Sequence, residues 1–215
     1  MRRAGLLLVA VGLTACAGCG PFRALAYYFS PERQQDAQFE LTRNALAIVI
    51  DGAPGSDDHP LFRQALHDQV ADLLREQKVN DEVVPYVRQL ELQQRHRGEY
   101  HRWTIQRIGR ELGAEQVIYI RVESFSLRDT PDYPVLTPRV TVRVKVIDAN
   151  SPVGDARLWP EDGAGHPSEC SRQASEATDA AHTDLVATKL GKDTAQFVGR
   201  LFFKHVVDEP IPREK

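Results

Sequence analysis

The chain of 215 residues lacks the short motifs that mark many enzymes. It contains no G-x-S-x-G nucleophile turn, no P-loop and no G-x-G-x-x-G dinucleotide fingerprint. No two of its histidines form an HExxH or comparable pair of metal ligands. We therefore predict no catalytic residues, no metal site and no cofactor. The seven histidines are His59, His67, His96, His101, His166, His182 and His205.

An excess of positive charge is also missing. The formal net charge is -3, and removal of a leader that contains Arg2 and Arg3 would make it -3 - 2 = -5. A mildly acidic protein without a basic patch is a poor binder of nucleic acid, so we expect no such partner. The chain has only 3 cysteines, but its length suffices for one domain with a core that needs no disulfide or metal.

The first 19 residues have the layout of a secretory signal. Two arginines precede an apolar run that is too short to span a membrane, and small residues follow. Residues 13–16, L-T-A-C, resemble the lipobox of bacterial lipoproteins. This resemblance implies that Cys16 receives a diacylglycerol and becomes the first residue after cleavage. We therefore predict a signal peptide at 1–15 and a lipidated tether at 16–44.

Two features of this region leave alternatives open. An ordinary secretory signal or an uncleaved anchor would make Cys16 incidental, and Cys19 is a second, poorer lipobox candidate. By analogy with enterobacterial sorting, Ala17 after Cys16 favours the outer membrane over the inner one. The aromatic residues at 27–29 could touch a membrane or a partner, or pack against the chain's own domain.

The first half of the predicted domain begins with strand, loop and helix. The apolar run at 45–51 predicts a central strand that is covered on both faces. An apolar stripe after Pro60 predicts an amphipathic helix to residue 76. Residues 79–84 suggest a short strand, and Pro85 could open a second helix. The basic segment 93–102 could bind phosphate, but its glutamate and the acidic chain favour a solvated loop.

The second half predicts an antiparallel pair of strands and a long final helix. A helix at 104–112, a stop at Gly113 and a strand at 117–122 precede a cleanly alternating strand at 139–148, its expected partner. Residues 157–159 suggest a third strand and 162–181 an extended loop. The final helix is expected at 183–206, with a kink at Gly191, before a disordered tail at 208–215. The fold class is therefore α/β (α+β): one domain at 45–207, three-layer-like, with helices packed on a mixed sheet.

Two groups of residues are candidates for chemistry. Asp51, Asp57, Asp58 and His59 follow the first strand, where α/β sheets often place their sites, although acidic residues also favour a helix N-terminus. A hydrolase that uses Asp51, Asp58 and His59 is the alternative function. If Cys16 is acylated, Cys19 and Cys170 remain as a candidate disulfide in an oxidising compartment.

Part of the domain resembles the small α/β domain of a group of bacterial envelope proteins. The resemblance rests on I-G-R-E-L-G-A-E-Q-V-I-Y-I-R-V at 108–122, V-R-V-K-V-I-D-A at 142–149 and L-W at 158–159. The group includes the N-terminal domain of TolB, the curli secretion lipoprotein CsgG, and the accessory lipoproteins LpoB and PelC. Glu115 stands where the group usually has Asp. The resemblance implies a structural motif without catalytic residues, and it does not imply pore formation.

These observations predict a non-enzymatic, lipid-anchored protein of the cell envelope. It would face the periplasm, with the outer membrane favoured, and would bind another envelope protein or assist an assembly. The sequence does not identify that partner, the ligand or the oligomeric state.

Overall fold

The computed structural model describes residues 34–52, 56, 59–130, 134–152, 156–176 and 179–207. The predicted signal peptide, Cys16, Cys19, Asp57, Asp58 and the tail at 208–215 lie outside these residues. The chain divides into two compact units, one of residues 1–35 with 206–209 and one of 36–205 with 210–215. Of the smaller unit little is described: β1 (Gln34–Gln35) pairs with β9 (His205–Val206). The larger unit carries the helices and the main sheet.

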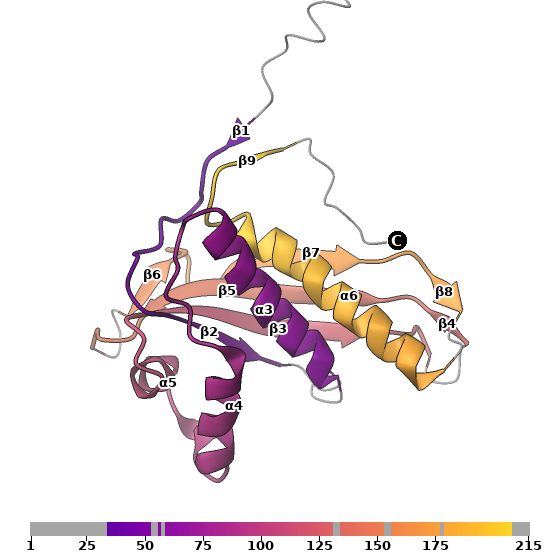
Figure 1. Cartoon of the computed structure of the whole chain (residues 1–215), viewed down its shortest axis with the longest axis horizontal. Helices are drawn as coiled ribbons and strands as arrows, with labels where there is room; N and C mark the ends of the chain where they lie inside the picture. Colours follow the sequence, from indigo (N-terminus) through magenta and orange to yellow (C-terminus); the bar gives the residue numbers. More distant parts are fainter. Residues whose placement is uncertain are drawn as a thin grey trace, which may run out of the picture. The chain divides into compact units, whose positions relative to one another are not determined.

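The larger unit is built on a mixed five-stranded sheet (Figure 1). Strand β2 (Leu46–Asp51) runs parallel to β3 (Gln116–Ser126), which is antiparallel to β5 (Arg139–Asp148). The other edge of β5 pairs with β6 (Arg157–Trp159) at one end and with β7 (His166–Ser171) at the other. The short strands β4 (Val135–Leu136) and β8 (Ser175–Glu176) form a separate pair. The predicted pairing of β3 with β5 is confirmed.

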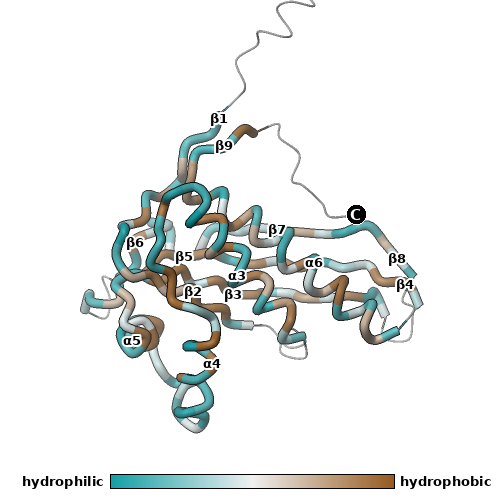
Figure 2. Tube along the Cα trace, in the orientation of Figure 1, coloured by the Kyte–Doolittle hydropathy of each residue, from teal (hydrophilic) through white to brown (hydrophobic). Residues whose placement is uncertain are grey.

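Helices lie on both faces of this sheet. On one face, α3 (Pro60–Glu76) and α6 (Ala180–Gly199) cover a large apolar core, in which Ile48, Ile118 and Val144 are buried. On the other face, α5 (Ile105–Glu111) and the end of α4 (Tyr86–Arg95) cover a smaller core near β2. The predicted α+β fold with a mixed sheet and a long C-terminal helix is confirmed. Figure 2 shows hydrophobic residues along the sheet strands and alternating hydropathy along α3 and α6.

The smaller core depends on the helix, glycine and strand at 104–126. The Thr104 hydroxyl accepts a hydrogen bond from the Arg107 N–H at 3.3 Å and so caps α5. Gly113 adopts φ +76°, which glycine tolerates without strain, and the chain turns there into β3. Ile108 and Val117 then pack in the smaller core. The helix and the glycine stop agree with the sequence prediction, whereas β3 continues to Ser126, beyond the predicted 117–122.

The sheet face that carries the smaller core is polar where α4 and α5 do not cover it. Along β3, Arg121 and Glu123 are exposed while Ile120 and Val122 are buried. The Arg143 Nε donates to the Glu123 carboxylate at 2.5 Å across the β3–β5 pair. This arrangement confirms the predicted wet face near the middle of the sheet.

Three predictions about strands were wrong. Strand β2 is buried on both faces, but it is not central: among the described residues its outer edge pairs only at the Leu46–Val83 bridge. Residues 79–84 accordingly form a bridge and turns instead of a strand. The predicted loop at 162–181 contains β7, β8 and the start of α6. Strand β7 was not predicted because it contains Pro167 and few β-branched residues. An edge strand tolerates such a composition.

The helices also differ in detail from the prediction. Helix α4 extends to Arg95, and Tyr100–Arg102 forms a 3-10 helix, η1, so the segment 93–102 is largely ordered structure instead of a loop. Helix α6 begins and ends earlier than expected and runs without interruption through Gly191. Within the described residues, no helix is both long enough and apolar enough to cross a membrane.

Candidate binding pocket

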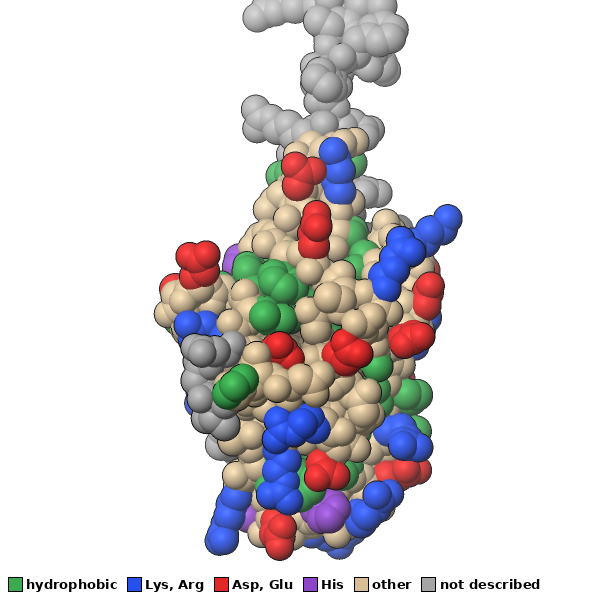
Figure 3. Space-filling view, turned by 90° about the vertical axis from the view of Figure 1, so that its left-hand side faces the viewer, with side chains coloured by type: hydrophobic (Ala, Val, Ile, Leu, Met, Phe, Trp, Pro, Cys, Tyr) green, Lys and Arg blue, Asp and Glu red, His purple; other side chains and the backbone are tan. Residues whose placement is uncertain are grey.

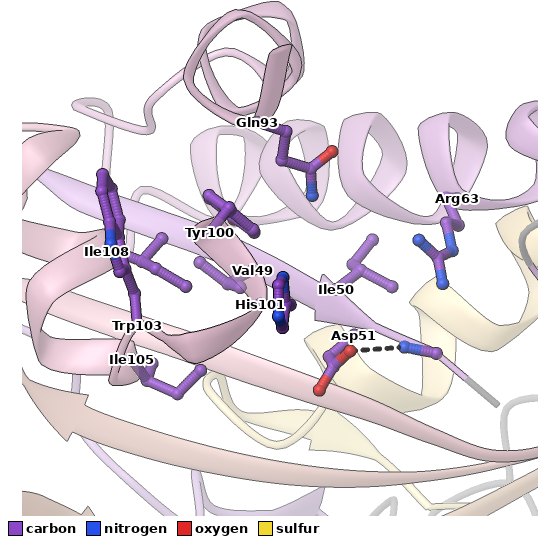
Figure 4. Close-up of a pocket in the computed structure, with 11 residues that line it drawn as sticks. Val49, Ile50, Asp51, Arg63, Gln93, Tyr100, His101, Trp103, Ile105 and Ile108 are labelled. Atoms are coloured by element: carbon purple, nitrogen blue, oxygen red, sulfur yellow. Dashed lines mark hydrogen bonds between the residues drawn. The ribbon is translucent and has the colours of Figure 1, made fainter. Parts of the chain in front are cut away.

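A cavity of about 370 Å³ lies at the carboxyl end of β2. Its volume falls within the range of small-molecule pockets, roughly 300 to 1,000 Å³. Residues of β2, α3, α4, η1 and α5 line it. Figure 4 shows that apolar and aromatic side chains lie at one end of the cavity and that Asp51 and Arg63 lie at the other. The lining residues are Val49, Ile50, Asp51, Gly52, Arg63, Gln93, Tyr100, His101, Trp103, Ile105 and Ile108.

The alternation of strand β2 brings Asp51 to this cavity. Ile48 and Ile50 belong to the core beneath α3 and α6, whereas Ala47 and Val49 belong to the smaller core on the opposite face. Because side chains alternate along a strand, Asp51 lies on the same face as Val49. The exposed end of β2 therefore presents a carboxylate beside η1 and α5.

Two hydrogen bonds hold the Asp51 carboxylate. The Tyr119 hydroxyl donates to Oδ2 at 2.8 Å, and the Gly52 N–H donates to Oδ1 at 3.0 Å. Burial, the hydrogen bond to Asp51 and the charge of Asp51 all raise the pKa of Tyr119. Tyr119 therefore stays a neutral phenol at physiological pH, and its hydroxyl donates a hydrogen bond to Asp51.

Arg63 brings a cation to the same end of the cavity. It lies in the first turn of α3, and its Nη2 donates to the Ser56 hydroxyl at 3.1 Å. Its guanidinium lies against Gly52, since a Cβ added to Gly52 would be 1.9 Å from Nη2. A carboxylate and a guanidinium therefore flank Gly52, which follows β2.

Aromatic residues form the opposite wall. The Trp103 ring, only 9% exposed, lies 5.9 Å from the ring of Tyr100 and 4.7 Å from that of His96, and the Arg107 guanidinium lies 3.9 Å from its centroid. Within the described residues, neither the Trp103 N–H nor the Tyr100 hydroxyl completes a hydrogen bond of ordinary geometry. Both of these donor atoms are buried from solvent, so the wall that faces the cavity is mainly aromatic and apolar.

The amides of Gln89 and Gln93 lie beside the Tyr100 hydroxyl. Burial is the main cause that raises the pKa of Tyr100, and the charge of Asp51 adds to it. Tyr100 is therefore a neutral donor, like Tyr119. The chemistry that the pocket offers is hydrogen bonding and charge pairing.

The predicted hydrolase residues Asp51 and His59 do not both line the pocket. Asp51 lines the pocket, but the His59 ring packs on Phe125, with centroids 5.4 Å apart. Asp58 lies outside the described residues. No hydrogen bond joins Asp51 and His59 among the described residues; the Asp51 carboxylate accepts hydrogen bonds from Tyr119 and Gly52. The described part of the chain also has no group of three or more His, Cys, Asp or Glu that could hold a metal ion.

The predicted cysteine chemistry stays untested. Cys16 and Cys19 lie outside the described residues, so lipidation and the disulfide remain predictions. Cys170 is described: it lies in β7 and is 4% exposed, within the core beneath α3 and α6.

Of the polar and aromatic lining residues, only Asp51 was predicted; Arg63, Gln93, Tyr100, His101 and Trp103 were not. Residues 93–102 were expected to form a solvated basic loop. The segment is indeed basic, since residues 86–111 hold six arginines and three glutamates. Figure 3 shows Lys and Arg side chains, with Asp and Glu among them, on the lower part of this end of the molecule. Tyr100 and Trp103 are large aromatic residues within a polar stretch, and they were the feature of the sequence that could have indicated burial.

Comparisons with known proteins give weak likenesses only. No protein-family model and no curated protein matches the chain. Among solved structures, a variant of the PelC dodecamer from Paraburkholderia phytofirmans is 17% identical, with a TM-score of 0.41, covering 80% of this chain and 98% of that one. The lipoprotein GNA1162 from Neisseria meningitidis is 14% identical, with a TM-score of 0.41, covering 67% and 93%. The hypothetical protein CT253 from Chlamydia trachomatis is 11% identical, with a TM-score of 0.38, covering 74% and 96%. Likenesses of this strength do not assign the chain to a family.

Proposed function

We propose that the chain is a non-enzymatic, lipid-anchored protein of the cell envelope whose folded domain binds another component of that compartment. The lipobox-like L-T-A-C at residues 13–16, behind a basic start and an apolar run, carries this proposal. Acylation of Cys16 would hold the domain on the periplasmic side of a membrane. Ala17 favours the outer membrane.

The length of the tether suits this role. Residues 17–33 separate Cys16 from β1, the first strand that the structure describes. A fully extended chain of this length would reach roughly 58 Å. The domain could therefore meet a partner well away from its own anchor.

The pocket at the end of β2 supports a binding role. Its carboxylate is held by Tyr119 and Gly52, and its remaining polar groups are mostly donors that could position a ligand. A cavity with an apolar wall and a few convergent polar groups is typical of binding sites. We therefore place ligand binding at this pocket.

Metabolic labelling tests the anchor. In a bacterial host grown with a clickable palmitate analogue, we expect label on the wild-type chain, none on Cys16→Ser, and undiminished label on Cys19→Ser, the matched control. Membrane fractionation of the labelled protein then separates inner from outer membrane. Unlabelled wild-type protein released into the periplasm or medium would refute the anchor.

An activity screen tests the non-enzymatic part. We expect purified protein to leave envelope polymers intact, and Asp51→Asn to behave in the same way. Cleavage by the wild type that Asp51→Asn abolishes would favour the hydrolase instead.

A further inference from the structure

The polarity of the pocket is divided along its length. Val49, Ile105, Ile108 and the ring of Trp103 form one end, where no charged group lines the cavity among the described residues. The charged end carries Asp51 beside Gly52 (Figure 4). A ligand that fills this cavity needs an apolar group at one end and a polar group at the other.

The charged end carries both signs of charge. The two Asp51 oxygens each accept one hydrogen bond, and a carboxylate oxygen can accept a second. The Arg63 guanidinium, whose Nη2 donates to the Ser56 hydroxyl, lies across Gly52 from this carboxylate and brings a positive charge to the same end. A simple anion would be repelled by Asp51 and a simple cation by Arg63. A ligand that carries a positive and a negative group close together would be attracted by both residues.

His101 adds a third polar group near the middle of the cavity. It lies on η1 and, in Figure 4, its ring lies between Val49 and Asp51. An imidazole can donate or accept a hydrogen bond, so it can contact either charged group of a zwitterion.

We propose that this pocket binds a free α-amino acid with an apolar side chain. The ammonium group bonds the Asp51 carboxylate, the carboxylate lies toward Arg63, and the side chain lies among Ile105, Ile108 and Trp103. The inference rests on the proposed function, because it names the ligand class of the same binding module.

A ligand series tests the proposal with the full acylated chain, purified in detergent. Isothermal titration would compare L-phenylalanine with N-acetyl-L-phenylalanine, which lacks the ammonium, and with L-phenylalanine amide, which lacks the carboxylate. We expect each capped compound to bind at least about tenfold more weakly than the zwitterion, as for the loss of one charged contact. Equal binding of all three, tighter binding of a capped form or of a dipeptide, or no binding of phenylalanine at millimolar concentration would overturn it.

Variants assign the two contacts. Asp51→Asn should lose the preference for phenylalanine over the N-acetyl compound, and Arg63→Gln the preference over the amide. Glu123→Gln is the matched control, because Glu123 lies on the same sheet face, bonded to Arg143 and outside the pocket lining. It should bind like the wild type, and a Glu123→Gln variant that binds as weakly as Asp51→Asn would contradict the assignment. Palmitate labelling tests lipidation independently of ligand binding. A wrong ligand class can therefore be distinguished from the absence of a lipid anchor.

Discussion

Gly191 of α6 lies directly against the backbone of Phe62 in α3. A Cβ added to Gly191 would be 2.5 Å from the Phe62 carbonyl oxygen and 3.2 Å from the Ala65 Cβ. The glycine therefore lets the two helices approach closely over the larger core. This contact explains a glycine in mid-helix, where the sequence suggested a kink.

We expect Gly191→Ala to destabilise the fold. Alanine is the better helix former by about 1 kcal/mol, but here its methyl group meets backbone that cannot yield without separating α3 from α6. Overpacking of this kind costs about 1 to 3 kcal/mol in the free energy of unfolding, measurable by urea denaturation. Gly98→Ala is the control, since nothing lies within 4 Å of its added Cβ, and it should change stability by less than about 0.5 kcal/mol. Equal effects of the two changes would contradict the close contact.

The main elements of the fold could be predicted because their signals are local. Burial imposes a recognisable pattern on each element: a continuous apolar run in β2, alternation in β5 and an apolar stripe at helical spacing in α3. Strand β7 gave no such signal, since it owes its place to hydrogen bonds with β5 and carries Pro167 at an edge. The edge position of β2 could not be predicted either, because helices and the turns before α4 bury it as thoroughly as a central strand.

The candidate site was predictable only in part. Asp51 stood out because it ends a buried strand, where α/β folds often place polar groups. The sequence contains no comparable sign of Tyr100, His101 and Trp103. The structure of residues 93–103 depends on Trp103, which packs beside Ile108 and Val49 in the smaller core. A non-local contact of this kind leaves no periodic pattern in the sequence.

Asn80 forms hydrogen bonds with the segment before β2. We expect that replacing Asn80 will lower the stability of the fold. Its Nδ2 donates to the carbonyl oxygens of Thr42 and Asn44 at 2.7 and 2.8 Å, and its Oδ1 accepts from the Glu82 N–H at 2.7 Å. The side chain is 1% exposed. At about 1 kcal/mol for each hydrogen bond, Asn80→Ala should lower the free energy of unfolding by about 3 kcal/mol.

The exposed Asn150 provides the matched control for Asn80. Asn150→Ala should change the free energy of unfolding by less than about 0.5 kcal/mol. If Asn80→Ala were equally mild, the three hydrogen bonds would not hold this segment.

An ion pair between Arg172 and Asp193 links the chain after β7 to α6. Its side chains are 15% and 7% exposed. Arg172→Leu would leave the Asp193 carboxylate buried without this partner, which should cost about 3 to 5 kcal/mol in thermal or chemical unfolding. The exposed pair of Arg75 and Asp72, at 42% and 57%, gives the contrast: Arg75→Leu should cost less than about 1 kcal/mol.

A double variant separates the charge from the packing. Arg172→Leu combined with Asp193→Leu removes both charges, so it should recover much of the stability that Arg172→Leu alone loses. A double variant that is no more stable than Arg172→Leu would show that packing, and not the loss of this charge partner, causes the destabilisation.

His67 should make the stability of the fold depend on pH. The side chain is 3% exposed, its Nδ1 lies 3.1 Å from the Asp68 Oδ1, and the centroid of its ring lies 5.2 Å from that of Tyr86. Burial is the main influence and lowers the pKa of His67 below its ordinary 6.5, although Asp68 opposes the shift. The folded state therefore binds this proton less readily than the unfolded state. Stability should fall as the pH drops below about 6.5 and protonation favours unfolding.

Two variants test this linkage through the free energy of unfolding measured across the acid range. His67→Gln cannot take up the proton, so its stability should fall less steeply below pH 6.5 than that of the wild type. Asp68→Asn removes the group that raises the pKa of His67, so the decline should continue to lower pH than in the wild type. A His67→Gln profile parallel to the wild-type profile would mean that other groups, such as His166, whose pKa burial also lowers, carry the pH dependence.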